Sequence, residues 1–392
     1  MTRVLLLHSG YIPHYRVPVY GRLSGYLKQH GFDLIVASDR IQPDNPHAVE
    51  FQFEEIRLSV GSITRLIQGR KIDVILLFVD MRHSYLFPTY FIAKGLLRRK
   101  VIYWGQGLNL ANPKSIRNLA YRIEHLLCDA IILYAEHLKK YVAPRFHRKT
   151  FIANNTLCMS YSGLRAENRT AVLATHGIST RKNIICVGRL QKRKRLEDLV
   201  AAHAHMNRAD VGLILVGPDS DGILNGLQGD NVYNLGPIYG TKMFDLLSAA
   251  DVYCLPGAVG LSIVDAFHCG LPLVTEEGDE SAEMMYLKDG RNGFIVPRGD
   301  IPTLAEKLLL LLDNDDVRKR FSDEARREIA ENGHVDKLCA GFRDALIYAT
   351  GRTARARSSW VSNVPESSSS ADGPGRPGRQ AESADGTVGT RR

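Results

Sequence analysis

The chain has 392 residues, 44% hydrophobic and 24% charged, which is enough for two or three globular domains and excludes a chain that is disordered throughout. Its net charge of +9 favours phosphorylated small molecules or anionic membrane surfaces as partners. Nucleic acid is the weaker option, and we expect no nucleic-acid partner, because no dense basic run is interleaved with aromatic residues. The six cysteines form no CxxC pair, and no apolar stretch approaches the length of a membrane span. These features predict a cytoplasmic protein, at most peripheral at the inner face of the cell membrane.

The first half of the chain alternates buried strands with helices. Strands are predicted at residues 4–7, 34–37, 74–79, 101–104, 130–134 and 151–153. Helices are predicted at residues 17–30, 90–98, 119–128 and 136–142. This alternation is typical of a parallel sheet with helices on both faces, where ligands bind beyond the carboxyl ends of the strands. In this half those ends carry His8, Gly10 and Gln106.

A polar stretch at residues 159–180 is predicted to be an irregular linker, and a second α/β series follows it. Its strands are predicted at residues 183–187, 212–216, 232–235, 252–255, 271–275 and 293–296. Its helices are predicted at residues 196–205, 242–249, 263–268, 302–312, 316–331 and 335–350. From residue 351 onward Ser, Gly, Arg, Pro and Ala dominate, which predicts a disordered tail.

Two cations follow the first strand of the second series. Gly188-Arg189-Leu190 comes directly after that strand, and Lys194 lies four residues beyond Leu190. Cations near the start of a helix can neutralise a diphosphate and stabilise it as it leaves. Taken alone, the run QKRKR at residues 191–195 is equally well explained as a solvated basic face.

The stretch CLPGAVGLSIVDAFHCGLPLVT at residues 254–275 supplies two further pieces. The backbone N–H groups of Gly260-Leu261-Ser262 can bind phosphate oxygens, and Ser262 is expected to cap the helix over residues 263–268. Asp265, in the first turn of that helix, is suited to accept hydrogen bonds from two ribose hydroxyls. Packing and capping explain each residue singly, but the order of all three pieces favours a nucleotide-sugar site.

With these motifs the second half resembles glycosyltransferase family 4, whose members are retaining, nucleotide-sugar-dependent enzymes of the GT-B fold. The resemblance rests on GRLQKRK (188–194), LVGPD (215–219), NLGPI (234–238), residues 246–275 and DGRNGFIVP (289–297). The first half matches more loosely, through residues 4–20, VIYWGQGLN, CDAIILYAEHLKKYV and NNTL. The resemblance implies that Arg189 and Lys194 are catalytic, acting on the donor diphosphate. The donor-binding residues that it implies are Gly188, Gly217, Pro237, Ile238, Gly260, Leu261, Ser262 and Asp265.

The resemblance also implies an α/β architecture with two Rossmann-like domains that face each other across a cleft. We expect an acceptor domain at residues 1–159, a donor domain at 160–333, a crossover helix at 334–350 that packs back on the first domain, and the tail at 351–392. The acceptor side would carry His8, Gly10, Arg16 and Gln106.

The function implied is transfer of a hexose or N-acetylhexosamine from a UDP- or GDP-sugar to a glycan or a polyprenyl-linked acceptor, for a cell-surface polysaccharide. In this family the leaving diphosphate is thought to help deprotonate the acceptor, so positioning and positive potential are the enzyme's contribution. No metal-ligand cluster or DxD-type pair stands out, so we expect no metal and no cofactor.

The sequence departs from the family at three positions. The family's signature is two Glu with seven residues between them, and here Gly257 replaces the first and Asp265 the second. The first Glu usually contacts the hydroxyls of the donor sugar, so the identity of the sugar stays open. Gln106 replaces a His that is common in the family, and Gln cannot exchange protons.

Three other functions stay open from the sequence. An NAD-dependent oxidoreductase is disfavoured, because no GxGxxG follows the first strand. A catalytically inactive GT-B protein that binds nucleotide sugars or acts as a scaffold would fit Gly257 and Gln106, and an epimerase of GT-B shape would need no acceptor.

One further stretch has two interpretations, core packing plus a basic surface or a membrane contact. It contains Tyr85, Phe87, Tyr90 and Phe91, followed by Arg98, Arg99 and Lys100.

Overall fold

The computed structural model describes residues 1–352 except 79–84, 111, 113, 117, 160–167, 279 and 280. Residues Met1–Thr353 form one compact unit. The predicted disordered tail lies outside the described residues from 353 onward. No helix in the described part of the chain is long and apolar enough to cross a bilayer.

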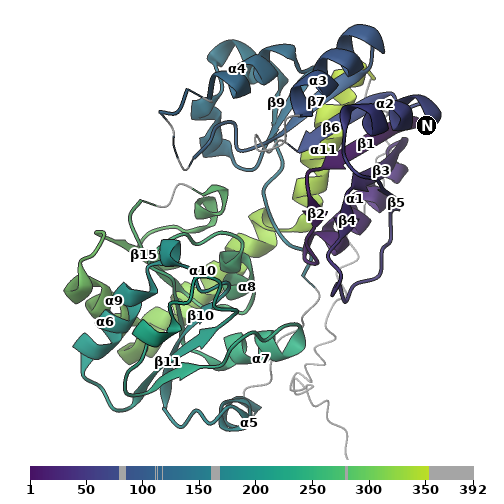
Figure 1. The fold of residues 1–392 in the computed structure, drawn as a ribbon. Helices are drawn as coiled ribbons and strands as arrows, with labels where there is room; N and C mark the ends of the chain where they lie inside the picture. The colour runs from purple at the N-terminus through teal and green to yellow at the C-terminus, as the bar shows by residue number, and fades with distance from the viewer. Residues whose placement is uncertain are drawn as a thin grey trace, which may run out of the picture. The chain divides into compact units, whose positions relative to one another are not determined.

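The first half forms a seven-stranded parallel sheet in the order β5-β3-β1-β6-β7-β8-β9 (Figure 1). Its strands are β1 (Thr2–His8), β3 (Phe32–Ser38), β5 (Gln52–Glu55), β6 (Val74–Phe78), β7 (Lys100–Gly105), β8 (Ala130–Leu133) and β9 (Thr150–Ile152). The connections include α1 (Arg16–Gln29), α2 (Val60–Gly69), α3 (Leu86–Phe91), α4 (Asn118–Leu127) and the short strand pair β2 (Tyr11–Ile12) and β4 (Arg40–Ile41).

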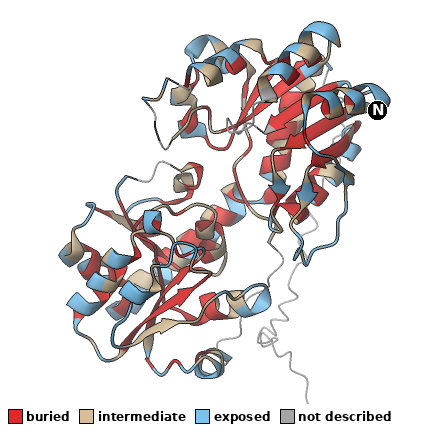
Figure 2. Ribbon diagram, viewed as in Figure 1, coloured by how far each residue is buried: buried red, intermediate tan, exposed pale blue. Residues whose placement is uncertain are grey.

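The second half forms a six-stranded parallel sheet in the order β12-β11-β10-β13-β14-β15. Its strands are β10 (Lys182–Val187), β11 (Val211–Val216), β12 (Val232–Asn234), β13 (Val252–Cys254), β14 (Leu273–Glu276) and β15 (Gly293–Val296). The helices are α5 (Arg169–Thr175), α6 (Leu196–Met206), α7 (Thr241–Ala249), α8 (Ser262–His268), α9 (Ile301–Asp313) and α10 (Asp315–Asn332). The inner strands of both sheets are buried, the edge strands β5 and β12 are only partly covered, and the outer faces of the helices are exposed (Figure 2).

The predicted α/β architecture is confirmed, and most differences concern short or polar elements. Helix α5 lies in the segment expected to be irregular, where only Leu173 of the helix is buried and the apolar period is weak. Helix α2 and strand β5 were not predicted, although Ser59 and Ser62 form a capping box at the start of α2. Residues 90–98 contain the end of α3 and a π-helix (Ile92–Leu96), and residues 136–142 contain a 3-10 helix (Glu136–Tyr141).

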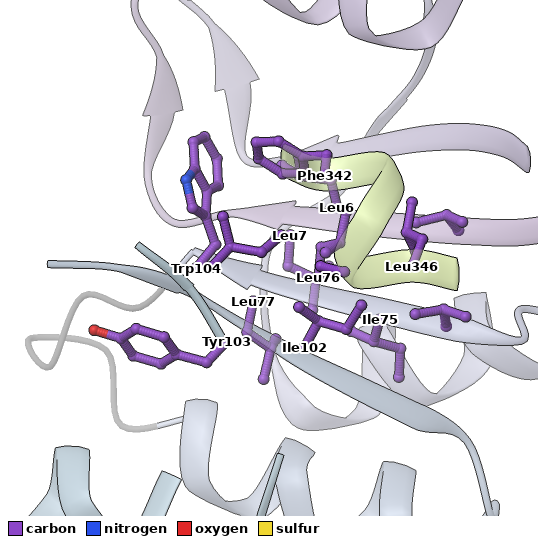
Figure 3. Close-up of a cluster of buried hydrophobic side chains, with 14 of the residues drawn as sticks. Leu6, Leu7, Ile75, Leu76, Leu77, Ile102, Tyr103, Trp104, Phe342 and Leu346 are labelled. Carbon is purple, nitrogen blue, oxygen red and sulfur yellow. The ribbon is translucent and has the colours of Figure 1, made fainter. Parts of the chain in front are cut away.

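Helix α11 (Val335–Thr350) follows the second sheet in the chain but packs on the first. The ring of Phe342 meets that of Trp104 edge-on, with 4.9 Å between centroids, and Leu346 is fully buried in the same cluster (Figure 3). The approach is close because Gly341 has no side chain; a β-carbon there would lie 2.1 Å from the carbonyl oxygen of Ile152. Burying these large side chains stabilises the attachment of the last helix to the first sheet.

Helix α4 turns polar side chains toward the protein interior. Glu124 and His125 are buried, and neither carboxylate oxygen of Glu124 has a hydrogen-bond partner in the described part of the chain. Burial raises the pKa of Glu124 to about 8 and, followed by the charge of Lys149, lowers the pKa of His125 to about 4. Both groups are therefore uncharged near neutral pH, since an unpaired charge is costly in a dry interior.

The burial of Glu124 should make stability depend on pH. The unfolded chain ionises this carboxyl near pH 4.3, whereas the folded protein holds it protonated up to about pH 8. Its stabilising contribution is therefore complete at acid pH and falls as pH rises to about 8. We expect urea unfolding of Glu124→Gln and wild type to show this change. The free energy of unfolding of the variant minus that of wild type should rise by up to about 1.4 kcal/mol per pH unit across this range. The exposed control Glu331→Gln should show a constant difference, and a constant difference for Glu124→Gln would contradict the expectation.

Candidate functional site

The predicted donor-site residues meet where the order of the second sheet reverses. Strands β10 and β13 are neighbours there, and the chain leaves them in opposite directions across the sheet. The loop after β10 carries Gly188, and the loop after β13 runs through Gly257 to Gly260. Ligands of open α/β sheets bind at this reversal, outside the carboxyl ends of the strands. The topology therefore brings the two loops to one edge.

Two glycines allow the loops after β10 and β11 to touch through their backbones. Gly217 has a φ of +145°, and a β-carbon on it would lie 1.9 Å from the carbonyl oxygen of Gly188. The N–H of Gly217 donates to the carbonyl oxygen of Gly236 at 2.8 Å, which brings in the loop after β12. That loop continues through exposed Pro237 and half-buried Ile238. Only glycine fits at residue 217, since both its φ and the space around it exclude a side chain.

Gly257 fixes the loop after β13 against the basic segment. Its N–H donates to the carbonyl oxygen of Lys194 at 2.9 Å, and the N–H of Ala258 donates to that of Arg193 at 3.1 Å. A β-carbon on Gly257 would lie 2.2 Å from the carbonyl oxygen of Arg193. The position where the resemblance implies a Glu therefore has no room for any side chain.

The two predicted catalytic cations occupy different environments. Lys194 ends the 3-10 helix Lys192–Lys194, is 6% exposed, and donates from Nζ to the carbonyl oxygen of Ala258 at 3.4 Å. Arg189 is exposed in the loop after β10. Lys194 thus places a positive charge beside the glycine loop, and Arg189 is accessible at the same edge of the sheet.

The basic run at residues 191–195 is only partly a solvated face. Lys192 and Arg193 are exposed, but Arg195 pairs with Asp198 and with Glu276, whose side chain is fully buried. Glu276 also accepts a hydrogen bond from the N–H of Gly299 at 3.1 Å. Burial is the main cause that raises the pKa of Glu276. The ion pair between Arg195 and Glu276 therefore connects β14 to the start of α6 and holds the basic loop. The local sequence around Arg195 gave no indication of this pair.

The short helix α8 presents Asp265 in its first turn, as predicted, but Ser262 does not cap it. The helix begins at Ser262, its N-cap is Leu261, and the Ser262 hydroxyl donates to the carbonyl oxygen of Val259 at 2.8 Å. Gly260, with a φ of +60°, forms the turn before it. Asp265 is half-buried, and loss of solvation raises the pKa of its carboxyl to about 7.

Among the residues predicted for the acceptor side, His8 is packed in the interior. Its Nδ1 lies 2.6 Å from the Tyr20 hydroxyl oxygen, and burial, with the charge of Arg16, lowers its pKa to about 3. A histidine with so low a pKa is neutral and a weak base near pH 7. Gly10, with a φ of +78°, forms a turn whose carbonyl oxygen accepts from the Ser38 hydroxyl at 2.6 Å. Gln106 is half-buried directly after β7.

Arg16 begins a buried polar chain that links three parts of the molecule. Its Nη2 donates to Asn155 Oδ1 at 2.6 Å, and Asn155 Nδ2 donates to Glu283 Oε1. Its guanidinium carbon lies 5.8 Å from the centre of the Trp104 ring. The second nitrogen, Nη1, is buried and has no hydrogen-bond acceptor among the residues that the structure describes. Asn155 thus connects Arg16 to Glu283, a residue that sequence reasoning missed.

The part of the chain that contains the donor loops matches a known family. Residues 181–314 match the model described as "Glycosyl transferases group 1". This part of the chain is therefore similar to the group 1 glycosyltransferases. The match covers Gly188, Lys194, Gly257, Gly260 and Asp265.

Individual relatives match over part of their length. The chain is similar to phosphatidyl-myo-inositol mannosyltransferase of Mycobacterium leprae, with 31% identity over 36% of this chain and 40% of that protein. It is also similar to N-acetyl-alpha-D-glucosaminyl L-malate synthase of Bacillus anthracis, with 26% identity over 44% of this chain and 47% of that protein. The matched region thus spans about half the length of these curated relatives or less.

Solved GT-B structures share the whole fold. Anabaena HepE in complex with UDP-glucose superposes with a TM-score of 0.69 and 17% identity, over 88% of this chain and 99% of that one. WaaG, a glycosyltransferase involved in lipopolysaccharide biosynthesis, superposes with a TM-score of 0.62 and 16% identity, over 87% and 98%. At this identity the likeness establishes the fold.

The closeness of Gly257 to residues 193 and 194 can be tested by adding one carbon. Gly257→Ala should lower the free energy of unfolding by about 1–3 kcal/mol, because the methyl group would force two backbone segments apart. Gly226→Ala is the matched control, since among the described residues no atom beyond its chain neighbours and its own helical turn lies within 4 Å of a β-carbon there. Equal denaturant midpoints for the two variants would show that the loops do not touch.

The raised pKa of Asp265 predicts pH-dependent binding of a nucleotide sugar. If the ionised carboxylate accepts the ribose hydrogen bonds, affinity should increase about tenfold between pH 6 and 8 as the group ionises around pH 7. Calorimetric titration with a UDP- or GDP-sugar suits this test, because its diphosphate does not titrate in the range. Asp265→Asn should bind more weakly and without this slope; an unchanged slope in the variant would assign the pH dependence to another group.

Proposed function

We propose that the protein is a retaining glycosyltransferase that moves a hexose or N-acetylhexosamine from a UDP- or GDP-sugar to a glycan or lipid-linked acceptor. The observation that carries the proposal is the convergence of Lys194, Gly188 and the Gly257–Gly260 loop at the reversal point of the second sheet, in the region that matches the group 1 glycosyltransferase model. Retention of configuration rests on the family resemblance. A polysaccharide of the cell surface is the product class that we favour.

The donor site would use charge where the diphosphate lies. Lys194, held beside the carbonyl oxygen of Ala258, and the accessible Arg189 would bind the diphosphate and stabilise the negative charge that develops as it leaves. The N–H groups of Gly260 and Leu261 would complete the phosphate contacts, and Asp265 would hold the ribose. The UDP-glucose named for HepE supports a uridine donor, and a guanosine donor is the alternative.

We propose that this chemistry needs neither a metal nor a cofactor, because fixed cations supply the positive potential. Among the described residues, no group of three or more His, Cys, Asp or Glu side chains is placed to hold an ion. Activity that is unchanged by EDTA would agree with the proposal, and restoration of an EDTA-treated enzyme by Mg²⁺ or Mn²⁺ would contradict it.

The acceptor would meet the first sheet at the ends of β1 and β7. Arg16 lies in the first helix after β1, and Gln106 offers an amide that can orient a hydroxyl but cannot take its proton. The low pKa of His8 makes a packing role more consistent than a general-base role. The name of the mycobacterial mannosyltransferase supports a lipid-linked acceptor. With such an acceptor, the protein would act at the cytoplasmic face of a membrane.

The decisive variants are Arg189→Ala and Lys194→Ala. Each should lower kcat by about a hundredfold or more, because each removes charge that stabilises the departing diphosphate. Lys192→Ala, an exposed neighbour in the same segment, is the control and should keep activity. Activity is measured as UDP or GDP released, and folding as the thermal midpoint without ligand.

A thermal-shift panel of UDP-sugars, GDP-sugars and NAD separates the alternatives. Stabilisation by a nucleotide sugar without transfer or hydrolysis would favour an inactive binding or scaffold protein, the function that Gly257 and Gln106 had left open. Stabilisation by NAD alone would overturn the assignment, and interconversion of free donors would indicate an epimerase.

A further inference from the structure

Helix α4 buries polar side chains and exposes large apolar ones, which is unusual for a helix that faces water. Its buried face carries Asn118, Glu124 and His125. Large apolar side chains point to solvent: Leu119, Ile123 and Leu126 are 57%, 38% and 58% exposed, and Ile116, just before the helix, is 87% exposed. With about 3.6 residues per turn, these four form one stripe. We call Ile116, Leu119, Ile123 and Leu126 the outer face of α4.

The stretch of sequence that contains this helix has the same net charge as the whole chain. Residues 91–149 contain twelve Lys and Arg against three Asp and Glu, an excess of nine that equals the net charge of the whole protein. Contacts place several of these cations beside the end of α4. Lys94 and Lys100 pair with Asp129, which closely follows the helix, and Lys149 Nζ donates to the carbonyl oxygen of Cys128 at 2.6 Å. Arg122 is exposed on the helix itself.

We propose that the outer face of α4 docks the protein on a bilayer that contains anionic lipid. Apolar side chains would enter the boundary between headgroups and acyl chains, and the surrounding cations would meet lipid phosphates. This proposal rests on the proposed function, in which a lipid-linked acceptor requires contact with a membrane. The surface differs from the membrane contact expected at Tyr85–Phe91, where Tyr90 is buried.

Charge argues against two other partners for this face, a second copy of the protein and the C-terminal part of the chain. A second copy presenting the same face would bring two strongly positive surfaces together, which is repulsive. The chain beyond residue 352 carries six Arg against four acidic residues and is also positive. An anionic surface with an apolar interior matches both properties of the face.

The test is flotation of the full chain with vesicles of phosphatidylcholine, alone or mixed with phosphatidylglycerol. Wild type should float with the mixed vesicles, less so as salt rises, and weakly with phosphatidylcholine alone. Leu119→Gln combined with Ile123→Gln should lower binding at least tenfold. Leu310→Gln combined with Tyr348→Gln, at side chains 39% and 48% exposed elsewhere, should leave it unchanged.

Three results would overturn the proposal: wild type that fails to bind mixed vesicles, an α4 variant that binds like wild type, or binding that salt and anionic lipid do not affect. Conversion of a wild-type dimer to a monomer by the α4 variant, seen by sedimentation, would show that a second copy covers the face. The thermal shift caused by nucleotide sugars, measured on the same variants, should be unaffected, so loss of vesicle binding and failure of the proposed function are distinguishable.

Discussion

The carboxyl edge of the second sheet depends on backbone segments that approach more closely than side chains allow. At Gly217 a β-carbon would collide with the carbonyl oxygen of Gly188, and at Gly257 with that of Arg193. These contacts bring three loops together and turn the Lys194 ammonium toward the carbonyl oxygen of Ala258. Such close packing allows little adjustment, so the position of one cation relative to the glycine loop is fixed by the fold before any ligand binds.

Close backbone contact at a glycine also attaches the last helix to the first sheet. Gly341 lets α11 reach the backbone at Ile152, and Phe342 and Leu346 then fill the space beside Trp104. Because the chain passes through the whole second sheet before it returns, folding of the first core includes residues more than 300 positions apart, such as Leu6 and Phe342. Truncation before α11 would therefore expose apolar surface in the first half of the molecule.

Much of the fold could be predicted because its buried strands are short apolar runs with glycine or polar residues after them. The order of the motifs also located Gly188, Lys194 and Asp265 at one edge of a sheet. Contacts between distant residues could not be predicted: the pair of Arg195 with Glu276, and the chain from Arg16 through Asn155 to Glu283, depend on packing that no local pattern records. The face of α4 was missed for a related reason, since periodicity locates an apolar stripe but does not say which stripe is buried.

The loss of the first signature Glu need not mean a decayed site. A residue lost from a working pocket leaves space or an unpaired polar group behind it. Here the space is occupied by the backbone of residues 193 and 194, and the N–H groups of Gly257 and Ala258 are both hydrogen-bonded to it. The loop is built around glycine, so a Glu placed at residue 257 could not reach a sugar without separating the loop from Lys194. If the protein binds a nucleotide sugar as proposed, groups from another element would recognise the hydroxyls of the sugar.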